Sequence, residues 1–181
     1  RMQNRMKLIL PLTLLLIFGF LYFSMRSIGQ SLLVMVAVPL SLIGGILLMW
    51  ILGYSTSVAV WAGAIALIGV AVETASIMIV FLESAWRRRR DANQLKSGSD
   101  FQAATLEGAM HSLRPVLMAV SMNIFGLLPV MMATGIGADV MKRLASPMFG
   151  GLVSLALLTL FVIPVVYMMK ESRLALRTVK K

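Results

Sequence analysis

Long apolar blocks, separated by short polar segments, occupy almost the whole chain. An apolar block of at least 18 residues with few charges is typical of a transmembrane helix, because about 20 residues are needed to cross a hydrocarbon core roughly 30 Å thick. Five blocks meet this description, and we predict transmembrane spans at about residues 5–25, 31–51, 58–86, 114–133 and 144–169. The pattern therefore predicts an all-α membrane protein in which residues 1–181 form a single transmembrane domain.

The segment 101–113 has a different pattern. Its apolar residues fall on one side of a helix, whereas Gln102, Glu107 and His111 fall elsewhere. An amphipathic helix of this kind favours a position along the membrane surface. We therefore predict five transmembrane helices plus one interfacial amphipathic helix, which directly precedes the fourth span.

Two glycine pairs lie inside predicted spans, Gly44-Gly45 in the second and Gly150-Gly151 in the fifth. Because glycine has no side chain, such pairs allow the backbones of two membrane helices to approach closely. We therefore interpret Gly44, Gly45, Gly150 and Gly151 as helix-packing residues rather than as parts of a binding site.

Composition agrees with a membrane protein and argues against a nucleic-acid partner. Hydrophobic residues make up 59% of the chain and charged residues only 13%, whereas soluble domains carry about 25% charged residues. The net charge of +10 could suggest nucleic-acid binding, but the positive residues gather at the ends of the apolar blocks, where they anchor spans against membrane lipid. The absence of cysteine excludes disulfides and thiolate metal sites.

The distribution of Lys and Arg predicts the orientation in the membrane. Most of the 17 basic residues fall on the side that contains the run 87–90 and the tail 170–181, so that side is predicted to be cytoplasmic. The C-terminus is then cytoplasmic, and with five spans the N-terminus is outside. No cleavable signal peptide is evident. A basic N-terminus outside the membrane is expected if another protein segment precedes Arg1.

Glu73 is the one ionisable residue deep inside an apolar span, about midway along the third. A carboxylate at the bilayer centre costs several kcal/mol, so it must face protein or water, or stay protonated. Intramembrane carboxylates commonly carry protons or ions, and we interpret Glu73 as a candidate proton-relay residue. The alternative is a protonated carboxyl group that only forms a hydrogen bond with a neighbouring helix.

Asn123 lies midway along the fourth span and is the second candidate relay residue. Its amide could reach Glu73 or a main-chain carbonyl group, and a plain hydrogen bond between helices is the simpler interpretation. Glu83 lies one turn before Arg87, which predicts an ion pair at the membrane interface.

No metal or cofactor site is predicted. His111 is the single histidine, and the sequence places no second ligand near it. The 15 methionines could suggest a path for a soft metal such as Cu(I) or Ag(I). Most of them occupy positions in apolar helices where leucine would serve equally well, so we interpret them as packing residues.

Several motifs, in the same order along the chain, resemble the resistance–nodulation–division (RND) permeases. The segment Gly-Val-Ala-Val-Glu-Thr at 69–74 is similar to the heavy-metal branch, since drug exporters usually carry Lys-Asn at positions 73 and 74. The other motifs are Pro-Leu-Ser-Leu-Ile-Gly-Gly at 39–45, Arg-Pro-Val-Leu-Met at 114–118, Gly-Leu-Leu-Pro at 126–129, Ala-Thr-Gly-Ile-Gly-Ala-Asp-Val-Met-Lys-Arg at 133–143, Pro-Met-Phe-Gly-Gly at 147–151 and Ile-Pro-Val-Val-Tyr at 163–167.

The resemblance implies a secondary transporter rather than an enzyme. Such permeases have twelve spans in the bacterial inner membrane and form homotrimers with a periplasmic adaptor and an outer-membrane channel. This chain would supply spans eight to twelve, with the N-terminal half missing. A carboxylate at the position of Glu73 takes part in the family's proton relay, so the implied function is proton-driven efflux of heavy-metal cations.

The resemblance leaves the metal open. Copper/silver exporters carry a lysine and a threonine where this chain has Val116 and Ala119, and the motif at 114–118 is common in cobalt, zinc and cadmium exporters. Two further functions are considered, a drug or amphiphile exporter of the same superfamily and a non-transporting membrane scaffold or truncated remnant. Glu73 followed by Thr74 argues against the drug exporter.

Overall fold

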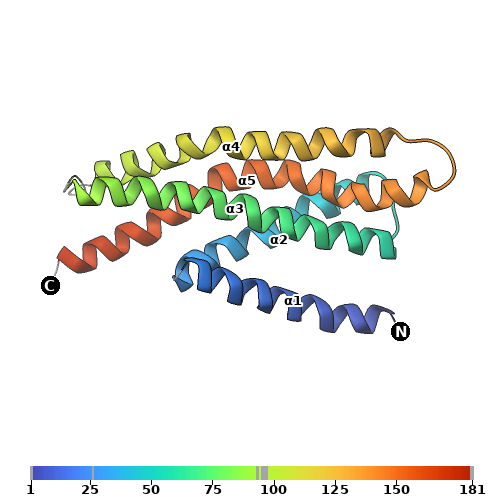
Figure 1. Ribbon diagram of the computed structural model, residues 1–181, viewed down its shortest axis with the longest axis horizontal. Coiled ribbons are helices and arrows are strands. Elements are labelled where there is room, and N and C mark those ends of the chain that lie inside the picture. The colour runs from blue at the N-terminus through green and yellow to red at the C-terminus, as the bar shows by residue number, and fades with distance from the viewer. Residues whose placement is uncertain (1, 26, 93, 95–97, 180–181) are drawn as a thin grey trace.

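The computed structural model contains five α-helices, and the residues that it describes form no β-strand (Figure 1). It describes residues 2–25, 27–92, 94 and 98–179, and the side chains of those that lie within 11–170. The helices are α1 (Met2–Met25), α2 (Ile28–Ile51), α3 (Val58–Asp91), α4 (Gly98–Met132) and α5 (Ala138–Val179). Successive helices run in opposite directions, so the N- and C-termini lie at opposite ends of the molecule (Figure 1). The predicted all-α class is confirmed.

Four helices are long and apolar enough to cross a membrane: α2, α3, α4 and the part of α5 from Ala138 to Lys170. They correspond to the second, third, fourth and fifth predicted spans. The described apolar part of α1, Pro11–Met25, is shorter. The side chains of residues 2–10 lie outside the described part, so the first predicted span, 5–25, stays a prediction.

The predicted interfacial helix 101–113 is the first part of α4 rather than a separate element, and α4 continues without interruption through Pro115. Phe101, Ala104 and Gly108, on the apolar side of this segment, are buried in the structure. A Cβ on Gly108 would lie 2.8 Å from the Cα of Leu82, so this side packs against α3. Part of the apolar side is therefore covered by α3, whereas Leu106 and Leu113 are exposed.

Helix α5 is the centre of the bundle. It packs against α2, α3 and α4, whereas α1 packs against α2 alone among the described helices. The main core contains fully buried residues from α2, α3 and α5, including Val34, Met78, Leu152 and Tyr167. The second, third and fourth predicted spans therefore all contact the fifth.

The backbones of α2 and α5 approach each other closely, as those of α3 and α5 do at Gly63. A Cβ on Gly44 would lie 2.5 Å from the carbonyl oxygen of Gly150, and a Cβ on Gly45 would lie 2.7 Å from that of Pro147. A Cβ on Gly151 would collide with the side chain of Leu67 in α3. Since side-chain atoms do not fit at these positions, each of the four glycines from the two pairs lies at a helix contact.

Arg143, in the first turns of α5, contacts the turn between α2 and α3. Its guanidinium group donates to Asp139 at 2.9 Å and to the hydroxyl of Ser55 at 3.3 Å, and lies 5.3 Å from the ring centroid of Tyr54. These contacts connect α5 to the α2–α3 turn. The Asp139 side chain is 69% exposed, so solvent screens this ion pair.

One buried hydroxyl group in the described core has no hydrogen-bond partner, that of Thr159 in α5. A buried polar group without a partner costs about 1–3 kcal/mol. We therefore expect Thr159→Val, which keeps the shape of the side chain, to raise the free energy of unfolding by about 1 kcal/mol. Thermal unfolding in detergent micelles would measure this change.

Ser154 provides the matched control. Its hydroxyl donates to the carbonyl oxygens of Gly151 at 3.0 Å and Ser41 at 3.2 Å, the second of which lies on α2. Ser154→Ala should therefore lower the melting temperature. A lower melting temperature for Thr159→Val would mean that the hydroxyl of Thr159 does have a partner, and would contradict the prediction.

Candidate functional site

Glu73 lies near the middle of α3, on the side of the helix that faces away from the bundle. Its side chain is exposed, and so are Gly69 and Val80 on the same side of the helix. The fully buried residues Ala71 and Ala75 lie on the opposite side. Among the described residues, no hydrogen bond or ion pair to Glu73 is formed. The carboxyl group therefore points out of the helices packed here.

The side of α3 that precedes Glu73 carries small side chains, whereas Val80 follows it on the same side. Ala62, Ala66 and Gly69 precede Glu73 along the same side of α3, and all three are exposed. Small residues on one side of a membrane helix allow another helix to approach closely. A carboxylate exposed to hydrocarbon costs several kcal/mol, whereas one covered by protein or water costs much less. This side of α3 therefore has the properties of a surface that another protein helix covers.

Asn123 does not complete this site within the chain. Its amide nitrogen donates to the carbonyl oxygen of Ala119 at 2.9 Å, one turn earlier in α4. This bond to the main chain lies within α4, so the hydrogen bond between helices that was the simpler interpretation is not formed in the described residues, and no hydrogen bond links Asn123 to Glu73 there. The reason is geometric, because α4 packs on the side of α3 that carries Met78 and Leu82, and Glu73 lies on the other side.

A second carboxylate, Glu83, connects three helices. Its Oε2 atom accepts a hydrogen bond from the amide nitrogen of Gln30, in α2, at 2.7 Å and another from the hydroxyl of Tyr167, in α5. Its Oε1 atom accepts from Nε of Arg87 at 2.7 Å, so the predicted ion pair is confirmed. Gln30 is 8% exposed and Tyr167 is fully buried. The sequence predicted the contact with Arg87 but not the other two.

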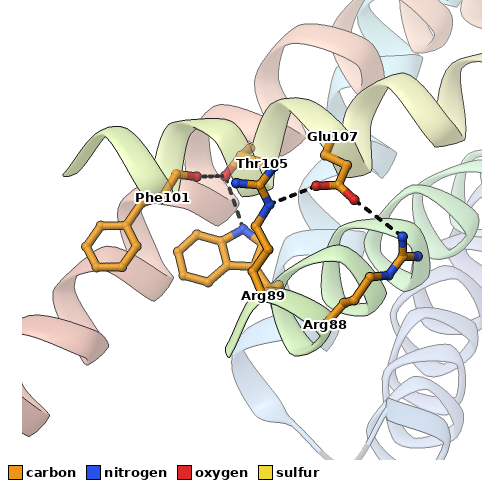
Figure 2. A network of polar contacts seen from close by, with 6 residues as sticks. Arg88, Arg89, Phe101, Thr105 and Glu107 are labelled. Atoms are coloured by element: carbon orange, nitrogen blue, oxygen red, sulfur yellow. Dashed lines mark hydrogen bonds and ion pairs between the residues drawn. The ribbon is translucent and has the colours of Figure 1, made fainter. Parts of the chain in front are cut away.

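The fourth helix joins the same end of the bundle through Trp86. Its indole stacks on Phe101 at 5.5 Å between centroids, meets Tyr167 edge-on at 6.0 Å, and donates to the hydroxyl of Thr105 at 3.1 Å. Glu107 lies one half-turn beyond Thr105 in α4 and faces the arginines of α3 (Figure 2).

The pairing of Glu107 with α3 is polar and partly exposed. Its carboxylate accepts from Nε of Arg89 at 2.8 Å and from Arg88 at 3.4 Å (Figure 2). Two thirds of the Arg88 side chain is exposed, at 66%. Exposed ion pairs contribute about 0–1 kcal/mol, so these contacts position α4 without fixing it strongly.

No cluster of three or more His, Asp or Glu side chains that could hold a metal ion occurs in the part of the chain that the structure describes. His111 is exposed on α4. The methionines are divided between the core and the surface, since Met78 is fully buried whereas Met118 and Met122 are 60% and 75% exposed.

Comparison with known proteins identifies the family. The model of the AcrB/AcrD/AcrF family matches residues 1–171, and the chain belongs to this family of RND permeases. The chain is 41% identical over 169 residues to the cation efflux system protein CusA of Escherichia coli K12, and 38% identical over 164 residues to the cobalt-zinc-cadmium resistance protein CzcA of Cupriavidus metallidurans. These alignments cover 92% and 91% of the chain.

Solved structures agree with this assignment. A crystal structure of a heavy metal efflux pump superposes with a TM-score of 0.82 and 35% sequence identity, over 94% of this chain. The chain spans 16% of the length of that pump and of CusA, and 15% of CzcA. It is therefore similar to one segment of a heavy-metal RND efflux permease.

Proposed function

We propose that this chain is the C-terminal membrane segment of a proton-driven permease that exports heavy-metal cations. The observation that carries the proposal is the position of Glu73, a carboxylate at the middle of an apolar span on the uncovered side of α3. A group in this position needs a second protein surface beside it, and the small residues around it leave room for one. The similarity to CusA and CzcA supports the same conclusion.

The proposed topology has five spans in the bacterial inner membrane. The opposite ends of the bundle hold the N- and C-termini (Figure 1), which is what an odd number of spans requires. The arginines at the end of α3 and Lys170 near the end of the α5 span favour a cytoplasmic position for the C-terminal end, by the positive-inside rule. The finer assignment of α1 as a span belongs to this proposal.

In the proposed mechanism, Glu73 changes charge during each transport cycle. Protonation from the periplasmic side makes the carboxyl group neutral and allows α3 to shift against the surface that covers it. Release of the proton to the cytoplasm restores the charge and the starting arrangement. The chain acts as part of a secondary transporter, and the cycle requires no covalent chemistry.

The partners follow from the family. The N-terminal half of the permease would cover the exposed side of α3, and the complete protein would form a homotrimer with a periplasmic adaptor and an outer-membrane channel. The class of metal stays open between Cu(I) or Ag(I) and divalent cobalt, zinc or cadmium. A drug or amphiphile exporter and a non-transporting scaffold are the alternatives that the experiment below must separate.

Metal tolerance of an efflux-deficient bacterium tests the proposal. The cell would express this chain alone, or the chain in place of the segment of CusA or CzcA that it matches, joined to all of the relative that precedes that segment, at equal amounts of membrane-inserted protein. We expect tolerance to copper, silver, zinc, cobalt or cadmium only in the joined form, because only there does Glu73 face a second surface. Tolerance to dyes or detergents without metal tolerance would favour the drug exporter. No tolerance in either form would favour the scaffold.

A further inference from the structure

The contacts of Glu83 lead to an inference about how α3 moves. In the middle of α3, near Glu73, the residues that face the bundle are mostly apolar, with Ala71, Ala75 and Met78 fully buried beside the hydroxyl-bearing Thr74. Apolar contacts have no preferred direction, so they allow one helix to slide or tilt against another. Ten residues further along, Glu83 accepts directional hydrogen bonds from two other helices.

We propose that Glu83 is a positioning residue that joins the ends of α2, α3 and α5 into a pivot, about which the part of α3 that carries Glu73 tilts. This inference rests on the proposed transport function. Hydrogen bonds to a charged group are about twice as strong as those between neutral groups. Gln30 is buried, so removing the carboxylate would take away the acceptor of its amide nitrogen inside the bundle.

Neighbouring contacts place the pivot at this end and not elsewhere. The side chain of Lys170, in α5, covers Gly29, in α2, so closely that a Cβ on Gly29 would lie 2.5 Å from its Cε atom. Tyr167 also touches Trp86, which ties α4 to the same point through Thr105. Four helices, α2, α3, α4 and α5, are therefore joined at Glu83 and Trp86.

The opposite end of α3 packs closely on α5, because a Cβ on Gly63 would collide with the carbonyl oxygen of Leu144, but no hydrogen bond from a described side chain of α3 to another helix is formed there. There Arg143 reaches the α2–α3 turn, but its partners are Ser55, at 3.3 Å, and the 69% exposed Asp139. Exposed pairs are weak because water and salt screen them. The buried directional contacts between α3 and other helices therefore lie at the Glu83 end, which is where we place the pivot.

The pivot has a direct structural test on the chain itself. The sequence contains no cysteine, so spin labels can be placed at Ile28→Cys in α2 and Val165→Cys in α5, both of which are exposed. The distance between the labels would be measured by pulsed electron–electron double resonance. We expect a narrow distribution that becomes broader with Tyr167→Phe, which removes one hydroxyl group and keeps the ring against Trp86.

Transport by the joined permease supplies the functional readout. If Glu83 sets a pivot, Tyr167→Phe and Glu83→Leu should lower kcat about tenfold while leaving KM for the metal and the pH at half-maximal rate unchanged. Glu83→Gln should retain more activity than Glu83→Leu, because its amide oxygen still accepts the hydrogen bond from Tyr167. A merely structural role would lower the amount of folded protein and leave the turnover of each folded molecule unchanged.

Glu107→Gln is the matched control. Glu107 pairs with arginines at the same end of α3, but these ion pairs connect α3 to α4 alone. We expect it to leave the label distances and kcat unchanged. The inference would be overturned by an unchanged distance distribution in Tyr167→Phe, or by equal effects of Glu107→Gln and Glu83→Leu. Failure of the proposed function shows differently, as a permease whose rate does not respond to Glu73→Gln, while the label distances still decide for or against the pivot.

Discussion

A Gly44→Val substitution is expected to disrupt the contact between α2 and α5 and to remove most of the folded protein. A single Cβ at this position would already lie 2.5 Å from the carbonyl oxygen of Gly150 and would collide with the hydroxyl of Ser154. Those atoms belong to the backbone and to a hydrogen-bonded side chain, so neither can move aside without shifting a helix.

The expected size of the effect follows from overpacking. Extra methyl groups in a packed core cost about 1–3 kcal/mol, and valine adds three carbon atoms where none fits, so we expect a loss of about 3 kcal/mol or more. A domain has only about 5–15 kcal/mol of stability. Thermal unfolding and the yield of monodisperse protein in detergent would measure the loss, and Gly44→Ala should give a smaller one.

Gly126→Val is the matched control for Gly44→Val. Gly126 lies inside α4, and a Cβ there would meet no atom within 4 Å. The same substitution should therefore leave the melting temperature unchanged or raise it slightly, because glycine is the less favourable residue in a helix. Equal losses for the two variants would show that the α2–α5 contact is not the sensitive one.

The helices themselves could be predicted because their signal is local. Apolar blocks of span length read directly as helices, and four of the five are candidate spans in the structure. Their ends were less predictable. The third block ends near position 86, whereas α3 continues to Asp91, and the fifth ends near 169, whereas α5 continues to Val179. Hydrophobicity marks where the hydrocarbon ends, but a helix can continue into water as long as its backbone hydrogen bonds are made.

The amphipathic segment 101–113 shows a second limit. An apolar stripe indicates that one side of a helix is covered, but it does not identify what covers it. Lipid headgroups and a neighbouring helix satisfy the same pattern, and here the cover is α3, which meets Gly108 and Phe101. A surface helix and the first half of a long helix therefore have the same signal in the sequence.

The candidate site was predictable only in part. Glu73 stands out in the sequence because it is a lone charge in an apolar block. The side of α3 on which it lies could not be known without the partners of α3. The contacts of Glu83 are similarly non-local, since Gln30 and Tyr167 are 53 and 84 positions away. Only Arg87, one turn away on the same helix, had a sequence signal.

Together, these contacts divide α3 into a fixed end and a freer middle. Polar and aromatic contacts gather around Glu83 and Trp86, whereas the middle meets its neighbours mainly through apolar side chains such as Met78 and leaves Glu73 uncovered. A lone carboxylate on the freer part of a helix is well placed to convert a change of charge into a displacement. This is why the largest functional effect is expected at Glu73 itself.

Glu73→Gln in the joined permease is expected to lower proton-driven metal export by about a hundredfold or more, because a carboxamide cannot take up or release a proton in this pH range. The substitution is not expected to lower the stability of the fold, because Glu73 is exposed and no described side chain forms a hydrogen bond with it. Metal uptake into inverted membrane vesicles, driven by an imposed pH gradient, would measure the rate at equal amounts of protein.

Asp139→Asn is the control for this experiment. Asp139 is also a carboxylate, but it lies in the first turn of α5. Its side chain is 69% exposed, and in the described part of the chain it pairs only with Arg143. Its loss should change export by less than about twofold, as expected of an exposed ion pair. If export in Glu73→Gln remained at the parental rate and kept its dependence on the pH gradient, the carboxyl group of Glu73 would not carry the proton. Glu73 would then be a packing residue, protonated throughout and hydrogen-bonded to the surface that covers α3.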